Sequence, residues 1–178
     1  MLKEKIGRRA VDFVRPGATV IIDAGTTTRQ LALYLKGFGR LTVLTNSLDI
    51  AEILSQNQNI TVIVSGGILQ ASSRHLIGMP AEQFFSRMHV DQLFTSANAI
   101  SLTDGFLSSN LHVVPIKQRM IEAARETVII ADSSKFNQTG IGLIAPLAAA
   151  HKLITDAGIS PEVAQAIRGM GIELIVAE

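Results

Sequence analysis

The sequence predicts an α/β protein in which a mostly parallel, open sheet carries helices on both faces. Short apolar runs alternate along the chain with segments whose apolar residues recur at helical spacing. The runs, such as 18–22 and 127–131, are continuous rather than interrupted by polar residues, which is typical of strands buried on both faces. Apolar residues make up 47% and charged residues 17% of the 178 residues, which suits one domain with a sizeable core. We therefore expect a single Rossmann-like domain over residues 1–178.

The first half of the chain contains four predicted helices and three predicted strands. Apolar positions 2, 6, 10, 13 and 14 predict an opening helix, which Arg15-Pro16-Gly17 ends. The next elements are a strand at 18–22, a helix at about 28–36, a strand at 41–44, a helix from the cap Asn46-Ser47 to about 55, a strand at 60–64 and a helix from Pro80 to about 87. Residues 68–79 are polar and are expected to be irregular.

The second half repeats the same alternation of strands and helices. Its predicted elements are a strand at 92–96, a loop at 98–110, a helix from Pro115 to about 124, a strand at 127–131, a strand at 152–155, a helix from Pro161 to 168 and a strand at 172–176. Residues 141–149 are apolar, and their length does not separate a buried strand from a buried helix.

Composition and charge exclude several classes of protein. The chain has no Cys, which rules out disulfides and Cys-based metal sites, and its four His are scattered, so we expect no metal and no cofactor. No apolar stretch approaches the ~18 residues that span a bilayer, and the first residues lack the apolar region of a secretory signal. A cytoplasmic location fits these features. The net charge of +1 is spread out, Trp is absent and Tyr occurs once, so the chain by itself is not expected to bind nucleic acid.

The segment Asp23-Ala24-Gly25-Thr26-Thr27-Thr28 is the most informative motif. It lies between a predicted buried strand and a predicted helix, so backbone N–H groups and the positive end of the helix dipole converge there. Three hydroxyls beside those donors would suit a phosphate or another small oxyanion. The alternative is that Gly25 only turns the chain and a threonine caps the helix.

Four more polar motifs follow predicted strands and favour the anion site over the simple turn. They are Thr45-Asn46-Ser47, Ser65-Gly66-Gly67, Ser96-Ala97-Asn98 and Asp132-Ser133-Ser134-Lys135. In open parallel sheets ligands bind beyond the carboxyl ends of the strands. Five such motifs on one edge of the sheet therefore predict a pocket.

The motifs together resemble the C-terminal effector domain of DeoR-family transcriptional regulators. The resemblance rests on Asp23 to Thr28, Thr45 to Ser47, Gly66-Gly67 with Gly78 beyond, Lys117 ahead of Met120-Ile121, Asp132 to Phe136, and Leu153 to Asp156, and it runs from about Ile6 to the end. It implies a bacterial repressor of sugar metabolism whose sensor domain binds a phosphorylated sugar, shares the fold of ribose-5-phosphate isomerase type A, glucosamine-6-phosphate deaminase and the CoA transferases, and works as a homo-oligomer. Operator DNA would be bound only through an N-terminal helix-turn-helix, which this chain lacks.

The expected ligand-binding residues combine the motifs with this resemblance. They are Asp23, Gly25, Thr26, Thr27, Thr28, Thr45, Asn46, Ser47, Gly66, Gly67, Arg74, Lys117 and Lys135. Lys135 matches the phosphate-binding lysine of the isomerases, and a cation beyond a strand would complement a bound dianion. Asp23 would repel phosphate, so it is expected either to accept sugar hydroxyls or to fix its own loop. Ala99 and Val113 depart from the family pattern in loops near the pocket.

Two functions of different classes remain open, with a weaker third. The enzymes of this fold need a positioned acid and base, and residues 95–100 hold neither a carboxylate nor an imidazole; Asp104 with Gly105 reads as a turn. We therefore expect a sensor without catalytic residues rather than a free-standing sugar-phosphate isomerase, deaminase or CoA-transferase-like enzyme. A module that serves only oligomerisation is the third possibility.

Overall fold

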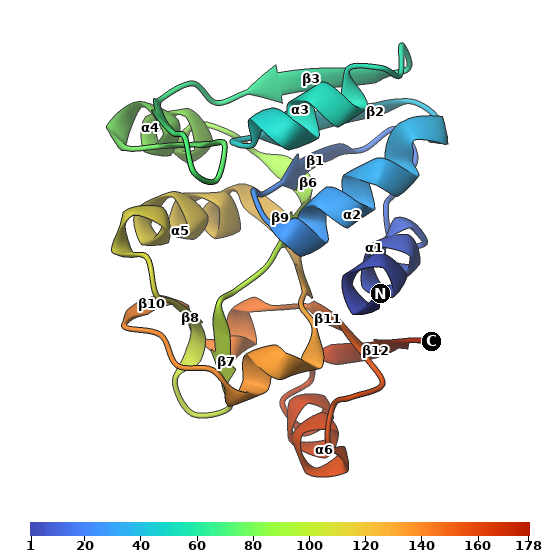
Figure 1. Ribbon diagram of the computed structural model, residues 1–178, viewed down its shortest axis with the longest axis vertical. Helices are drawn as coiled ribbons and strands as arrows, with labels where there is room; N and C mark the ends of the chain where they lie inside the picture. The colour runs from blue at the N-terminus through green and yellow to red at the C-terminus, as the bar shows by residue number, and fades with distance from the viewer.

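A seven-stranded parallel sheet forms the centre of the computed structural model, which describes residues 1–178. Its strands are β1 (Thr19–Ile22), β2 (Leu41–Thr45), β3 (Ile60–Val64), β6 (Val90–Thr95), β9 (Ala124–Ile130), β11 (Lys152–Asp156) and β12 (Glu173–Ala177). Their order across the sheet is β12-β11-β9-β6-β1-β2-β3, and every neighbouring pair is parallel (Figure 1). The predicted α/β fold with a mostly parallel open sheet is confirmed.

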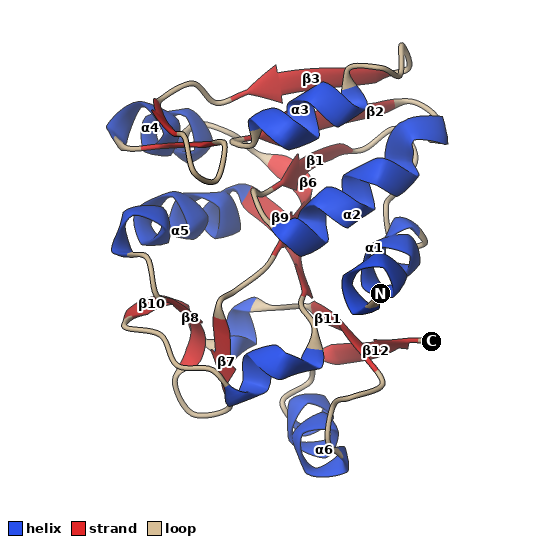
Figure 2. Ribbon diagram, in the orientation of Figure 1, coloured by secondary structure: helices blue, strands red, loops and turns tan.

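Six α-helices surround the sheet (Figure 2). They are α1 (Leu2–Val11), α2 (Thr26–Tyr34), α3 (Leu48–Leu54), α4 (Met79–Ser86), α5 (Val114–Ala123) and α6 (Pro161–Gly169). Each was predicted, although α2 begins two residues earlier than expected, inside the threonine triplet. None of them is long and apolar enough to cross a lipid bilayer.

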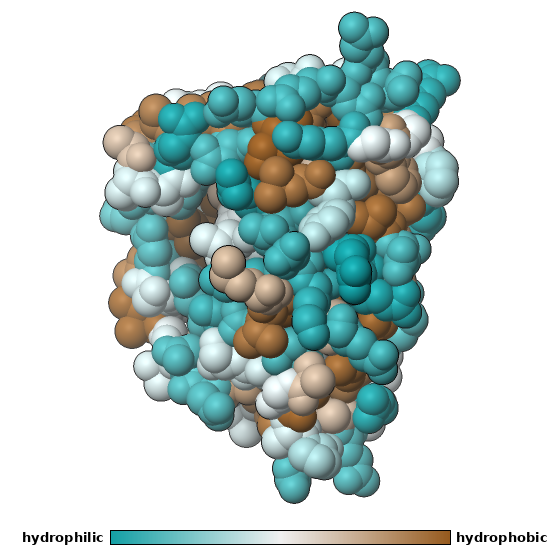
Figure 3. Space-filling model, turned by 45° about the vertical axis from the view of Figure 1, so that its right-hand side comes forward, coloured by the Kyte–Doolittle hydropathy of each residue, from teal (hydrophilic) through white to brown (hydrophobic).

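Alternate residues of the central strands pack against different helices, as a doubly covered sheet requires. Val20 and Ile22 of β1 belong to the same apolar cluster as residues of α1, α2 and α3. Ile21, between them, packs instead with residues of α4 and α5. β3 is the exception, because it is an edge strand and Thr61, Ile63 and Val64 are exposed. The face seen in Figure 3 is mostly hydrophilic, and its apolar surface is divided among separate patches.

Two predicted irregular segments contain short antiparallel strands, so those two predictions are wrong. Residues 68–79 form a hairpin of β4 (Ile68–Gln70) and β5 (His75–Ile77). The predicted loop 98–110 contains β7 (Ala99–Ser101) and β8 (Gly105–Ser108), which join β10 (Gly142–Ala145) in a three-stranded sheet. Strands of three or four residues are too short to produce a recognisable period in the sequence. The ambiguous segment 141–149 contains β10 and the 3-10 turn η4 (Leu147–Ala149).

The strand order places a crevice next to β1. The chain builds β1, β2 and β3 toward one edge, and then returns to place β6 on the other side of β1. Loops that leave β1 and β6 therefore diverge toward opposite faces. In open α/β sheets this point of reversal is where ligands bind, at the carboxyl ends of the strands.

The contact between α1 and α2 depends on Gly7. A Cβ at this position would lie 2.5 Å from Cβ of Gln30 and 2.7 Å from the backbone nitrogen of Leu31. We expect Gly7→Ala to push the helices apart and to lower the free energy of unfolding by about 1–3 kcal/mol. Urea unfolding measures this loss. Gly37→Ala is the matched control, because nothing lies within 4 Å of its added Cβ; an equal loss in both variants would refute the close-packing explanation.

Glu126 makes the stability of the fold depend on pH. Its carboxylate contacts Arg15 at 2.6 Å, Gln92 at 2.7 Å and Lys152 at 3.2 Å, and these partners lower its pKa to about 2 against the opposing effect of burial. A lowered pKa favours folding above the unfolded value of 4.5, and this contribution disappears as the pH falls through about 2. The shift in pKa corresponds to about 3 kcal/mol in the free energy of unfolding. We expect Glu126→Gln to reduce the loss of stability between pH 4.5 and 2 in urea titrations, and an unchanged pH profile would contradict this assignment.

Candidate functional site

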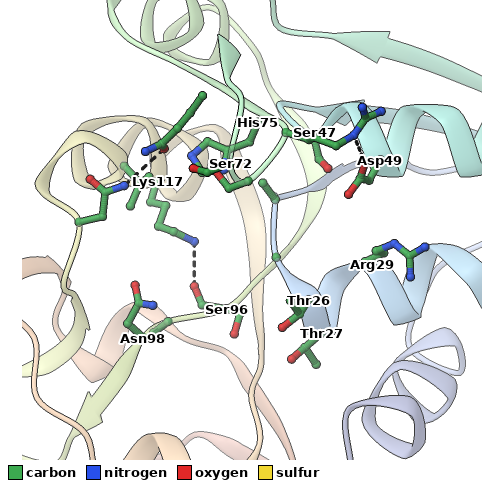
Figure 4. Close-up of a pocket in the computed structure, with 18 of the residues that line it drawn as sticks. Thr26, Thr27, Arg29, Ser47, Asp49, Ser72, His75, Ser96, Asn98 and Lys117 are labelled. Carbon is green, nitrogen blue, oxygen red and sulfur yellow. Dashed lines mark hydrogen bonds and ion pairs between the residues drawn. The ribbon is translucent and has the colours of Figure 1, made fainter. Parts of the chain in front are cut away.

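A cavity of about 650 Å³ lies at the carboxyl ends of the parallel strands (Figure 4). Its walls come from the loops that follow β1, β2, β6, β8 and β9, from the turn between β4 and β5, and from the start of α5. The predicted site residues that line it are Gly25, Thr26, Thr27, Ser47, Arg74, Lys117 and Lys135. The sheet therefore brings together residues that are more than 100 positions apart in the sequence.

One end of the cavity has a positive electrostatic character. α2 begins at Thr26 with no side-chain cap and no acidic residue in its first turn, so its first N–H groups lack side-chain acceptors. Lys3 of α1 donates a hydrogen bond to Oγ1 of Thr26 at 2.9 Å. Arg29 and Lys135 also line the cavity, and neither forms an ion pair within the protein. Free amides and cations that line the same cavity suit an anion.

Three predicted site residues lie behind this wall and fix its shape. Thr28 donates to the carbonyl of Gly25 at 2.9 Å, and Thr45 donates to the carbonyl of Ile22 at 2.6 Å. The side-chain oxygen of Asn46 accepts from the N–H of Ala24 at 2.9 Å. Thr28, Thr45 and Asn46 are 2% exposed or less, so the geometry gives them a supporting role rather than a direct contact with a ligand.

Gly66 and Gly67 lie outside the cavity wall. Both have positive φ angles, 71° and 120°, and they turn the chain from β3 into β4. A Cβ on Gly67 would lie 2.7 Å from the carbonyl oxygen of Ile77, so the glycine is required for the hairpin to pack. The loop after β3 leads into the hairpin of β4 and β5. The turn at the other end of this hairpin lines the cavity instead.

A buried ion pair lies at the base of the cavity. The ammonium of Lys117, on α5, contacts the carboxylate of Asp23, at the end of β1, and the two residues are 8% and 1% exposed. Lys117 also donates to the carbonyl of Ser96 at 2.8 Å and to Oγ1 of Thr95 at 3.2 Å. Thr95 in turn donates to the Asp23 carboxylate at 2.6 Å. All three ammonium hydrogens are thus used within the protein. For Asp23, the geometry supports fixing the loop over binding sugar hydroxyls.

Arg74 lines the cavity but is already paired with carboxylates. Its guanidinium lies 2.5 Å from Asp49 and 3.3 Å from Glu52, both on α3. Its side chain is 53% exposed. It is also the one non-glycine residue with a positive φ, 49°. These contacts tie the turn between β4 and β5 to α3, and they leave Arg74 less available to an anion than Lys135.

Several residues in or beside the cavity were not among the predicted contacts. They are Lys3, Arg29, Asp49, Ser72, His75, Ser96, Asn98 and Asn110. Lys3 was missed because its contact with Thr26 joins two helices across 23 positions of the sequence. His75 belongs to the segment 68–79, which was expected to be irregular, and β5 places it in the cavity wall. Asp104 accepts from Ser101 at 2.7 Å and lies outside this cavity, as the turn interpretation predicts.

The lining favours a polar ligand. Only three of its 20 residues, Ala24, Ala97 and Val113, are apolar, and none is Phe, Tyr or Trp. No group of three or more His, Asp or Glu is arranged to hold a metal ion. Hydroxyl and amide groups such as Ser72, Ser96 and Asn98 can exchange hydrogen bonds with a polyhydroxylated molecule.

Comparison with known proteins gives a consistent result at the level of sequence. Residues 1–157 match the family described as the DeoR C terminal sensor domain. The chain is 30% identical over 175 residues to a putative aga operon transcriptional repressor of Escherichia coli O157:H7, covering 98% of this chain and 65% of that protein. It is 36% identical to the uncharacterized HTH-type transcriptional regulator YulB of Bacillus subtilis, covering 97% and 66%. The chain thus spans about two thirds of the length of these relatives.

Solved structures share the fold at low sequence identity. Ribose 5-phosphate isomerase A from Neisseria gonorrhoeae superposes with a TM-score of 0.54 at 18% identity, covering 75% of this chain and 52% of that chain. The eIF2B beta subunit from Chaetomium thermophilum gives a TM-score of 0.58 at 14% identity, covering 85% and 49%. An enzyme and an initiation-factor subunit on the same fold mean that the fold by itself does not identify the activity.

Proposed function

Since this chain belongs to the DeoR C-terminal sensor domain family, we propose that it is the effector-binding domain of a transcriptional repressor and that it binds a phosphorylated sugar without converting it. Its relatives are transcriptional regulators. The operator DNA would be bound by a helix-turn-helix elsewhere in the intact regulator. Effector binding can alter operator affinity only if the sugar phosphate binds one conformation of the regulator better than the other.

One observation carries this proposal: the uncapped first turn of α2 lies in a cavity with unpaired cations and a polar lining. Thr26 and Thr27 offer amides and hydroxyls, and Lys135 offers an ammonium without an internal partner. Amides, hydroxyls and an ammonium are the groups that bind a phosphate dianion. The remaining hydroxyl and amide side chains suit the sugar, whereas the lack of aromatic residues disfavours a nucleobase.

A sugar-phosphate isomerase, deaminase or CoA-transferase-like enzyme is the second candidate function. Its support is the fold shared with ribose 5-phosphate isomerase and the presence of ionisable groups, His75 and the Lys117–Asp23 pair, at the cavity. Binding without turnover is favoured because Asp23 and Lys117 are already bonded to each other and to Thr95, which leaves neither free to move a proton.

A thermal-shift screen followed by calorimetry tests the proposed function. Ribose 5-phosphate, glucose 6-phosphate, fructose 6-phosphate and galactose 6-phosphate would be compared with the unphosphorylated sugars. We expect at least one phosphorylated sugar to raise the unfolding midpoint, and its free sugar to have no effect at the same concentration. Coupled assays on the same compounds should show no turnover. Turnover would establish the enzyme instead, and no response to any phosphorylated sugar would leave oligomerisation as the remaining role.

A further inference from the structure

His75 lies in the cavity wall on a backbone that is firmly attached to the neighbouring loop. Residues Ser47 and His75 form an isolated antiparallel bridge, and the N–H of Leu76 donates to the carbonyl of Asn46 at 2.7 Å. The N–H of Leu48 donates to the carbonyl of Arg74 at 3.0 Å. The ring is therefore held at the cavity while the turn 71–74, which precedes it, is exposed. Figure 4 shows His75 beside Ser72 and Lys117, across the cavity from Thr26 and Thr27.

The outer nitrogen of this ring has no partner. Nε2 of His75 is one of only two buried side-chain polar atoms without a hydrogen bond; the other, Oγ1 of Thr155, is on β11 and does not line the cavity. Buried polar atoms in folded proteins are nearly always bonded, so an unbonded one at a cavity wall calls for a partner from outside the chain.

The surroundings of the ring define what that partner must be. Burial, and then the Lys117 ammonium, lower the pKa of His75, while Asp23 and the backbone of Ser73 act in the opposite direction. The lowered pKa keeps the imidazole neutral at neutral pH, with one N–H and one lone pair. The N–H can lie on either ring nitrogen, so Nε2 can donate or accept one hydrogen bond.

We propose that His75 is a specificity-determining residue that forms, through Nε2, a hydrogen bond with a hydroxyl of the bound sugar. The inference rests on the proposed function, because the phosphate held at Thr26 and Lys135 orients the hydroxyls toward the opposite wall. Nε2 has almost no exposed surface, so the hydroxyl reaches it when the turn 71–74 shifts. That turn ends at Arg74, whose positive φ is unfavourable for a non-glycine residue. The strained backbone and the unbonded nitrogen are thus in adjacent residues.

The test compares two variants of His75 against two kinds of ligand. His75→Leu removes both ring nitrogens at similar size, and His75→Gln restores an amide that can donate or accept a hydrogen bond near the position of Nε2. Calorimetry would use the tightest of the four sugar phosphates above, with inorganic phosphate as the matched control ligand. We expect His75→Leu to lower the affinity for the sugar phosphate about tenfold, which corresponds to one lost hydrogen bond. His75→Gln should recover most of this loss of affinity. Affinity for inorganic phosphate should stay within about twofold in both variants.

Unfolding separates this role from a purely structural one. Because His75→Leu removes an unbonded buried nitrogen, its unfolding midpoint should equal or exceed that of the wild type. Equal sugar-phosphate affinity in wild type and His75→Leu would overturn the inference and leave the proposed function intact. An equal loss of affinity for inorganic phosphate in His75→Leu, or a lower unfolding midpoint of this variant, would also overturn the inference. Either result would mean that His75 supports the structure of the site. If the wild type binds neither sugar phosphates nor phosphate, the proposed function fails and the inference falls with it.

Discussion

Replacing Lys117 by methionine should lower the free energy of unfolding by about 3–5 kcal/mol, because it leaves the buried carboxylate of Asp23 without a counter-ion. Asp23 is 1% exposed, and Thr95 would be its one remaining side-chain partner. For a domain of this size the loss corresponds to a fall in unfolding midpoint of about 6–20 °C.

The double variant Asp23→Asn with Lys117→Met is the matched control. It removes both charges and keeps a polar group beside Thr95, so it should recover most of the stability that Lys117→Met loses. The experiment also decides the role of Lys117. If Lys117→Met unfolds like the wild type and only its affinity for sugar phosphates falls, then Lys117 binds the ligand directly and the buried pair does not stabilise the loop.

Replacing Lys135 by methionine should weaken the binding of sugar phosphates by about 10- to 150-fold with little change in stability. Lys135 lies on the 3-10 turn η3 (Ser133–Asn137) after β9, lines the cavity and has no ion-pair partner. Removing it deletes a charge-assisted contact with phosphate of about 1.5–3 kcal/mol. Because no internal partner is left unpaired, the free energy of unfolding should change by less than about 0.5 kcal/mol. Calorimetry with a sugar phosphate and with inorganic phosphate measures the loss of affinity, and we expect this loss for both ligands.

Lys36→Met provides the control for a general change in charge. Lys36 is an exposed lysine on the 3-10 turn η1 (Leu35–Gly37), outside the cavity. The variant Lys36→Met alters the net charge by the same amount as Lys135→Met. Because Lys36 lies outside the cavity, its replacement should have a small effect on affinity at physiological salt. Equal losses in the two variants would mean that Lys135 acts through the overall field of the protein. Unchanged affinity in Lys135→Met would remove Lys135 from the phosphate site.

The positions of the strands and helices were predictable because each rests on local pattern. β3 has the predicted bounds, and α3 is capped by Ser47, whose side chain accepts from the N–H of Ile50. The pocket at one sheet edge was predictable for a related reason, since parallel strands must end on the same edge. Polar residues that follow buried strands, such as Thr26 and Lys135, therefore had to lie near one another.

The direction of each side chain at that edge could not be predicted from the sequence. Thr27 and Thr28 are neighbours in the same triplet, yet Thr27 lines the cavity and Thr28 bonds back to Gly25. Gly66-Gly67 looks like the glycine turn at Gly25, but β3 is the edge strand, so its loop leaves the cavity. Position within the sheet, which depends on strand order, distinguishes these cases.

The sequence by itself determined the α/β class, the bounds of its main elements, four of the loops that form the pocket and the family resemblance, because those follow from short-range periodicity and local motifs. Tertiary structure alone decided which groups remain free to meet a ligand. Lys117 is tied to Asp23 across 94 positions, Lys135 has no ion-pair partner, and Lys3 reaches Thr26 from another helix. His75 lines the cavity and has a buried nitrogen without a hydrogen bond. Hydrogen bonds and ion pairs depend on distances of a few ångströms between segments far apart in the chain, and only the packed fold sets those distances.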